Sequence, residues 1–334
     1  MADINLTPRR PILVGIGGDS GSGKSTLAAA FYDLFGEDRI TTICLDDYHA
    51  LDRRERKLVE LTALHPRANN FYLMEEQLLA LKRGEAIDKP IYDHADGTFK
   101  GPERIEPKEV AIIQGLHPFL ASSVRNLFDL KVWLDPEPEL RIEWKLQRDQ
   151  AKRGYNEEEV RAELEARRPD VEAYITPQRA EADMVVRFSR PKPELRDMGH
   201  LNVRVSQRHT LPRLSFDQGL DDGEIVRYLV DVEDEDGEQA DVIEIDGRVT
   251  TDKALKVEEE MWGHIGDRQH HLRKVEPLVL GSYDEPSEAG HSDPLALTQL
   301  ILAHRILSAE KSVLVRVSAD DHDGHSHLGE HQHI

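Results

Sequence analysis

Near its N-terminus the chain reads PILVGIGGDSGSGKST, from Pro11 to Thr26. The first six of these residues are mostly apolar and predict a short buried strand, and the helical periodicity that continues to Phe35 predicts a helix directly after the glycines. Between the two, residues 18–25 fit the pattern G-x-x-x-x-G-K-[ST] of a phosphate-binding loop. An ordinary tight turn would have no need of the Lys-Ser pair. The stretch therefore predicts a nucleotide-binding site in an α/β fold.

The chemistry of this loop follows from its backbone. Glycines permit a sharp turn that points successive N–H groups at phosphate oxygens, and the N-terminus of the helix adds its positive dipole. We expect Lys24 to reach the β- and γ-phosphates of ATP, and the hydroxyl of Ser25 to bind Mg²⁺. The predicted nucleotide-binding residues are Gly18, Asp19, Ser20, Gly21, Ser22, Gly23, Lys24, Ser25 and Thr26.

Apolar runs and helical periodicity alternate up to about Pro191, which is typical of a mainly parallel or mixed sheet flanked by helices. The further predicted strands are residues 40–45, 110–113 and 130–134, and the predicted helices are residues 75–83, 140–153 and 157–168. The fold class is therefore predicted to be α/β, with a core of the P-loop NTPase type.

The second half of the chain has a different pattern. Short strands broken by Gly, Asp and Pro fill residues 202–247, and helices are predicted at residues 251–262 and 294–309. This half is either a second β-rich unit or an extension of the same sheet. The predicted organisation is a kinase core at residues 1–195, a β-rich extension with helices at 196–318 and a His-rich tail at 319–334.

The composition limits the classes of partner. The 334 residues carry a formal net charge of -21, which disfavours nucleic acid and anionic membranes as partners. A phosphate site in such a protein must concentrate Lys and Arg locally. No apolar run approaches the roughly 20 residues that span a bilayer, and residues 1–10 contain no apolar signal core, so we expect a soluble, cytoplasmic protein. The five histidines from His322 onwards predict a disordered tail or a weak transition-metal site.

Two adjacent carboxylates follow the second predicted strand. Asp46 and Asp47 lie where the carboxyl end of a parallel strand faces the ligand crevice. A carboxylate at this place can accept the proton of an attacking hydroxyl group, and it can equally cap the next helix or loop. The sequence leaves both interpretations open.

Two groups of basic residues stand out in this acidic chain. The first is Arg53, Arg54, Arg56 and Lys57, and the planar guanidinium groups of the three arginines suit a phosphate. The second is Lys145, Arg148, Asp149 and Arg153, of which the first three share a helix face. Solvated helix faces and surface ion pairs give the same patterns, so neither group by itself identifies a site.

Several blocks in order along the chain resemble phosphoribulokinases of the plant and cyanobacterial type, within the phosphoribulokinase/uridine kinase family. The resemblance runs from about Ile12 to Arg187 and continues more loosely to about Ala309. Its blocks are GDSGSGKST at 18–26, ICLDDYH at 43–49 with LDR at 51–53, PRANNF at 66–71, KPIYDH at 89–94, GLHP at 115–118, and QRD at 147–149 with RG at 153–154.

The resemblance implies a reaction and a role for several residues. Members of the family branch transfer the γ-phosphate of ATP to the 1-hydroxyl of ribulose 5-phosphate. Asp46 falls on the position of the catalytic base. His49, Arg53, Tyr92 and His94 fall on positions that bind the sugar phosphate. Lys145, Arg148 and Arg153 match basic residues of substrate binding and phosphoryl transfer, and Asp149 matches a position of less certain role. The branch also implies a homodimer.

Three positions depart from the family pattern. Gln114 stands where the family usually has a glutamate that helps to hold Mg²⁺, so the expected metal set is Ser25, Asp46 and Gln114, with weaker binding. Ser22 replaces a loop cysteine of the light-regulated members, which leaves Cys44, the single cysteine of the chain, without a disulfide partner. A redox-switched partner complex is therefore not expected. His65 stands where the family commonly has Asp.

The resulting hypothesis is a phosphoribulokinase with Asp46 as general base. The alternatives are a related kinase that acts on another sugar phosphate or on uridine, and a catalytically impaired regulatory relative in which Gln114 has weakened the metal site.

Overall fold

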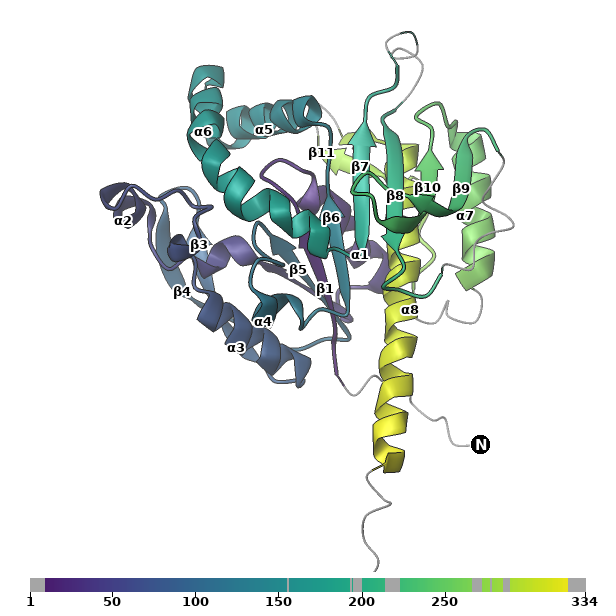
Figure 1. Ribbon diagram of the computed structural model, residues 1–334, viewed down its shortest axis with the longest axis horizontal. Helices are drawn as coiled ribbons and strands as arrows, with labels where there is room; N and C mark the ends of the chain where they lie inside the picture. The colour runs from purple at the N-terminus through teal and green to yellow at the C-terminus, as the bar shows by residue number, and fades with distance from the viewer. Residues whose placement is uncertain are drawn as a thin grey trace, which may run out of the picture.

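The computed structural model describes residues 10–323 except 155, 193, 195–199, 214–222, 266–271, 277 and 285–288, and it leaves undescribed the side chains of Lys152, Arg153, His264, Asp284, Ala289 and residues 310–323. Its centre is an eight-stranded sheet in the order β2-β5-β1-β6-β7-β8-β10-β9, with helices on both faces (Figure 1). Two small two-stranded sheets, β3-β4 and β11-β12, accompany it.

The strands are β1 (Ile12–Gly17), β2 (Ile40–Cys44), β3 (Ile87–Asp93), β4 (Thr98–Ile105), β5 (Val110–Gly115), β6 (Leu130–Leu134), β7 (Met184–Ser189), β8 (Asn202–Arg208), β9 (Val226–Glu233), β10 (Gln239–Ile245), β11 (Ser282–Asp284) and β12 (Ala289–His291).

The α-helices are α1 (Lys24–Phe35), α2 (Arg53–Leu58), α3 (Phe71–Lys82), α4 (Ser122–Arg125), α5 (Pro138–Arg153), α6 (Glu157–Asp170), α7 (Thr251–Ile265) and α8 (Asp293–Asp323). Shorter helical segments are η1 (Leu45–Tyr48), η2 (Pro66–Ala68), η3 (Val171–Ile175) and η4 (Thr176–Glu181).

Strand β1 shows why the sheet needs helices on both faces. All six of its residues are buried, and it pairs in parallel with β5 on one side and β6 on the other. Ile12, Val14 and Ile16 join the core under α1, α7 and α8, while Leu13 joins the core under α3 and α4. A Cβ atom on Gly15 would lie 2.6 Å from the ring of Phe119, so a larger residue here would force this buried ring to shift.

The α/β fold class predicted from the sequence is confirmed. The strands β2, β5, β1, β6 and β7 pair in parallel, and β8 pairs antiparallel with β7. The β-rich half of the chain therefore extends the same sheet. Among the described helices, none combines the length and the apolar composition that crossing a bilayer requires.

Besides the short elements α2, α4, β7, β11 and β12, which were not predicted, the structure differs from the prediction at two places. The hairpin β3–β4 was not predicted, because β4 is exposed along almost its whole length and β3 contains Pro90, so neither strand shows an apolar alternation. Helix α8 begins at Asp293 and continues to Asp323, past the predicted end at Ala309 and into the predicted tail. The rest of that tail, residues 324–334, lies outside the described residues.

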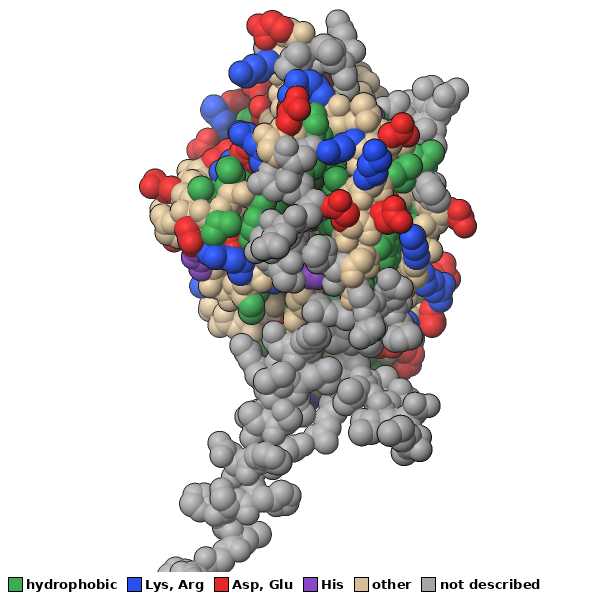
Figure 2. Space-filling model, turned by 90° about the vertical axis from the view of Figure 1, so that its right-hand side faces the viewer, with side chains coloured by type: hydrophobic (Ala, Val, Ile, Leu, Met, Phe, Trp, Pro, Cys, Tyr) green, Lys and Arg blue, Asp and Glu red, His purple; other side chains and the backbone are tan. Residues whose placement is uncertain are grey.

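The acidic charge is dispersed on the face that carries the C-terminal part of the sheet. On the visible part of this face, Asp and Glu side chains lie among those of Lys and Arg (Figure 2).

Candidate functional site

The phosphate-binding loop joins β1 to α1 with three glycines in the positive-φ region, Gly18, Gly21 and Gly23. The ammonium group of Lys24 donates to the carbonyl oxygens of Gly18 at 2.8 Å and of Asp19 at 2.9 Å. Burial lowers the pKa of Lys24, while the charge of Asp46 acts in the opposite direction. The loop thus holds the ammonium group of Lys24 within its own turn. This is the place where the phosphates of a nucleotide bind.

The structure separates the two adjacent carboxylates. Asp47 accepts hydrogen bonds from the backbone N–H of Tyr92 at 2.9 Å and from Nζ of Lys89 at 2.5 Å, so its role is structural. Asp46 instead lines a cavity, and none of the described residues forms a hydrogen bond or ion pair with its carboxylate. Of the two, only Asp46 is available to take a proton.

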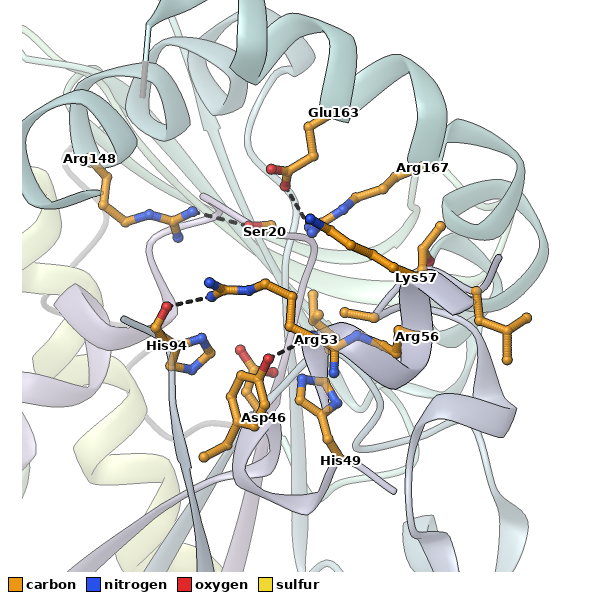
Figure 3. A pocket seen from close by; sticks show the side chains of 15 residues that line it. Ser20, Asp46, His49, Arg53, Arg56, Lys57, His94, Arg148, Glu163 and Arg167 are labelled. Carbon is orange, nitrogen blue, oxygen red and sulfur yellow. Dashed lines mark hydrogen bonds and ion pairs between the residues drawn. The ribbon is translucent and has the colours of Figure 1, made fainter. Parts of the chain in front are cut away.

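The cavity has a volume of about 300 Å³ and lies between the phosphate-binding loop, η1, α2, β3, α5 and α6. Figure 3 labels lining side chains from the phosphate-binding loop, η1, α2, α5 and α6, together with His94 directly after β3. The lining includes five Lys or Arg side chains, two histidines and two carboxylates, namely Arg53, Arg56, Lys57, Arg148, Arg167, His49, His94, Asp46 and Glu163. An acidic protein therefore places a cationic cavity beside its phosphate-binding loop.

Helix α2 supplies three of these cations because its first turn is fixed by a capping box between Asp52 and Glu55. Arg53 donates to the carbonyl oxygens of His94 and Ala95, which ties α2 to the β3–β4 turn. Lys57 is exposed toward the cavity, whereas Arg54, the fourth member of the predicted cluster, does not line it.

Three aromatic side chains meet at one wall of the cavity. The ring of Tyr92 packs edge-on against His49 at 4.7 Å and against His94 at 5.1 Å between centroids. Its hydroxyl accepts a hydrogen bond from Arg56 at 2.7 Å. Burial lowers the pKa of His49 to about 4, so near neutral pH this ring offers hydrogen bonds and not a charge.

Helix α5 brings a buried ion pair next to the phosphate-binding loop. Lys145 and Asp149 are one turn apart, their charged atoms are 2.7 Å apart, and their side chains are 1% and 0% exposed. Arg148 binds the same carboxylate at 2.8 Å and also donates to the hydroxyl of Ser20 at 3.3 Å (Figure 3). The predicted helix group therefore reaches the phosphate loop. Arg153 is the last residue of α5, and its side chain lies outside the described part.

The predicted metal ligands come from three different elements. Ser25 is exposed in the first turn of α1, Asp46 lies on η1, and Gln114 lies near the end of β5, beside Cys44 in the sheet register. The Oε1 atom of Gln114 is buried and has no hydrogen-bond partner among the described residues. A buried amide oxygen without a partner is uncommon. This donor set of a hydroxyl, a carboxylate and an amide oxygen fits Mg²⁺, with one negative charge fewer than a glutamate at position 114 would give.

Two other sequence departures have local explanations. Burial raises the pKa of Cys44 to about 12, so this residue is a protonated strand thiol. His65 is the N-cap of η2, where its Nδ1 accepts a hydrogen bond from the backbone N–H of Arg67 at 3.1 Å. An aspartate accepts the same kind of bond at an N-cap, which accounts for the exchange.

Sequence reasoning missed the residues that α6 and the start of α5 contribute. Glu163 and Arg167 project from α6 into the cavity, 2.9 Å apart (Figure 3). Arg141 on α5 pairs with Asp19 of the phosphate loop at 2.7 Å. The i, i+4 spacing of Glu163 and Arg167 was visible in the sequence, but the same spacing marks ordinary surface ion pairs.

Comparisons with known proteins give the family of the chain. A family model described as "Phosphoribulokinase / Uridine kinase family" matches residues 13–192. The phosphoribulokinase of Synechocystis sp. is 47% identical over 215 residues, which cover 63% of this chain and 65% of that protein. The chloroplastic phosphoribulokinase of Spinacia oleracea is 39% identical over 239 residues, covering 65% and 60%. A uridine kinase of Geobacillus kaustophilus is 34% identical over 183 residues, covering 53% and 86%.

Among solved structures, the phosphoribulokinase from Rhodobacter spheroides has the same fold, with a TM-score of 0.54 and 17% identity over 78% of this chain and 98% of that chain. In sequence, the chain spans slightly less than two thirds of the phosphoribulokinases it matches, 65% and 60% of the two named above. The family match covers more than half of the 334 residues, from the phosphate-binding loop through the helices that line the cavity. The chain therefore belongs to the phosphoribulokinase/uridine kinase family.

Proposed function

We propose that the protein is a phosphoribulokinase, which transfers the γ-phosphate of ATP to the 1-hydroxyl of D-ribulose 5-phosphate. One observation carries the proposal. Arg53, Arg56 and Lys57 line the cavity beside Asp46, and none of the three forms an ion pair with a carboxylate of the described residues. Such an excess of positive charge next to a base fits an acceptor that carries its own phosphate.

The proposed reaction assigns each group of residues one task. Lys24 exchanges the loop carbonyls for the β- and γ-phosphates of ATP, and Asp46 takes the proton of the acceptor hydroxyl as its oxygen attacks the γ-phosphorus. The bond between that phosphorus and the bridging oxygen of ADP breaks. Lys145 and Arg148 lie on the α5 side of the loop, where they would offset the charge that accumulates on the transferred group.

The acceptor would bind on the opposite wall. His49, Arg53, Tyr92 and His94 surround the cavity there, and Arg153 is proposed to join them from the end of α5. Mg²⁺, held by Ser25, Asp46 and Gln114, would neutralise the phosphate oxygens of ATP.

An ADP-release assay tests the proposal with three acceptor conditions: D-ribulose 5-phosphate, uridine and no acceptor. Turnover that depends on the pentose phosphate supports it. Turnover with uridine alone would replace it by the uridine kinase alternative, and no acceptor-dependent turnover at high Mg²⁺ would favour the impaired regulatory relative. Rates with other phosphorylated sugars decide the acceptor within the sugar phosphate class.

Lys57 and its neighbour Arg54 allow a matched test of the acceptor phosphate. Lys57→Met should raise the KM for ribulose 5-phosphate about 10- to 100-fold, because a hydrogen bond to a charged group contributes about 1.5–3 kcal/mol. Arg54→Met removes the same charge from the same helix outside the cavity, and its KM should stay near wild type. Equal effects of the two changes would mean that α2 acts only through long-range charge.

Gln114 is the position that limits the metal site. Gln114→Glu should lower the Mg²⁺ concentration needed for half-maximal activity about tenfold, because it restores an anionic oxygen beside the nucleotide phosphates. Calorimetric titration of ADP with and without Mg²⁺ measures the same coupling without turnover. An unchanged Mg²⁺ dependence in both measurements would remove Gln114 from the metal set.

The remaining expectations concern assembly and location. The resemblance favours a homodimer, which sedimentation velocity measures directly, and a cytoplasmic location. Cys44 is the single cysteine and is protonated, so no partner complex switched by disulfide exchange is expected.

A further inference from the structure

The wall of the cavity proposed to bind the acceptor, here called the acceptor wall, consists of His49, Arg53, Tyr92 and His94. Tyr92 contacts several of the side chains around it. Its ring contacts His49 and His94, its hydroxyl binds Arg56, and the Arg56 guanidinium also lies 5.3 Å from the ring centroid. The side chain is only 4% exposed. A shift of Tyr92 would therefore move several groups that face the acceptor at once.

Strand β3, which carries Tyr92, belongs to a sheet of two strands. It pairs with β4 alone, and the register between the two strands shifts between Lys89 and Ile91. Pro90 lies at this irregularity and has no backbone N–H to donate. The partner strand β4 is exposed along almost its whole length, and its ring contact with Tyr92 comes from Phe99, at 5.7 Å between centroids.

Asp47 supports β3 from the side opposite β4. One carboxylate oxygen accepts the N–H of Tyr92 at 2.9 Å, and the other accepts from Lys89 at 2.5 Å. Lys89 donates in addition to the carbonyl oxygen of Pro90 at 3.1 Å, so the ammonium group spans the bulge. The Asp47 and Lys89 side chains are 13% and 6% exposed, which shields the pair from water.

We propose that Asp47 and Lys89 form a positioning pair that fixes Tyr92, and with it the acceptor wall, relative to Asp46. Asp46 and Asp47 are adjacent on η1. The side chain of Asp46 lines the cavity, whereas that of Asp47 binds β3. The distance between base and acceptor is thereby set through two neighbouring residues of one short turn. This inference rests on the proposed function, since it concerns the acceptor of that reaction.

Two variants test the pair in the full-length protein. Lys89→Met keeps the apolar stem and removes the ammonium group, and Asp47→Asn keeps an oxygen for the N–H of Tyr92 while it removes the charge. Each should raise the KM for ribulose 5-phosphate about tenfold, since displacements near 1 Å at a reacting group are costly. The KM for ATP should stay within about twofold, because neither residue contacts the phosphate-binding loop. The double variant should be no worse than either single variant, as expected for two residues that act as one unit.

Asp129 offers a matched control at the other end of β1. It is 11% exposed and accepts hydrogen bonds from Arg10 and from the backbone N–H of Leu13, the same combination of a cation and a peptide group. Asp129→Asn should lower stability to a similar degree and leave the acceptor KM unchanged. An equal rise of this KM in Asp129→Asn, or no rise in the two pair variants, would overturn the proposal.

Hydrogen exchange separates this inference from the proposed function. Asp47→Ala should speed amide exchange in the peptide that covers Ile87–Asp93 at least about tenfold, whereas Asp129→Ala should leave that peptide unchanged. Unchanged exchange in Asp47→Ala would overturn the positioning role whatever the acceptor is. Absence of wild-type turnover together with faster exchange would overturn the function and keep the positioning role.

Discussion

Asp46→Asn should lower kcat for the transfer to ribulose 5-phosphate by about 10²- to 10⁴-fold, the usual contribution of a positioned general base. The substitution keeps the size and shape of the side chain and removes the oxygen that takes the proton. The carboxylate of Asp46 has no hydrogen bond or ion pair with the described residues, so its loss breaks no other contact. The KM for ATP should change little, since Lys24 and the loop amides bind the phosphates.

Asp47→Asn is the control for Asp46→Asn. Asp47→Asn removes an adjacent carboxylate from the same turn, and at saturating acceptor its kcat should remain far above that of Asp46→Asn. Both variants are best compared at saturating Mg²⁺, because Asp46 also belongs to the proposed metal set. A kcat of Asp46→Asn within about tenfold of wild type would assign the base to another residue.

The phosphate-binding loop could be predicted because its geometry is local. A strand, three glycines at positive φ and a helix N-terminus occupy consecutive residues, so the pattern contains its own structural context. The choice between Asp46 and Asp47 could not be made in the same way. It depends on which carboxylate of η1 faces β3, and β3 is a strand that the sequence did not reveal.

The α6 side of the cavity was hidden for a related reason. Glu163 and Arg167 look like any ion pair on a helix surface until the packing of α6 over the phosphate loop directs them inward. In the β-rich half, the sequence predicted the strands but not the strand of the core with which they pair. Pairing of β8 with β7 is a long-range contact, and no local pattern states which edge a strand joins.

A second large effect is expected on stability. Asp149→Ala should lower the free energy of unfolding by about 3 kcal/mol, because the buried Lys145 loses its partner at 2.7 Å and keeps, among the described residues, only Glu163 at 3.3 Å. Although burial alone would raise the pKa of Asp149, hydrogen bonds and charge from Lys145 and Arg148 lower it. A lowered carboxyl pKa stabilises the fold above the ordinary pKa of Asp, and this contribution is lost as the pH falls through the lower folded value. Urea unfolding at pH 7 and near pH 3 measures both the loss and its decline in acid.

A double variant separates the contribution of this pair to stability from its contribution to function. Lys145→Met with Asp149→Leu replaces the ion pair by apolar side chains of similar size, which is often neutral or stabilising. We expect it to recover most of the stability that Asp149→Ala loses and to remain inactive, since Lys145 is proposed to offset the charge on the transferred phosphate. Glu157→Ala breaks an exposed pair with Arg161 at the same i, i+4 spacing, with both side chains 57% exposed, and should change neither property. Full activity of the double variant would show that the pair serves only the packing of α5, and the phosphoryl-transfer role would then rest on Lys24 and Arg148.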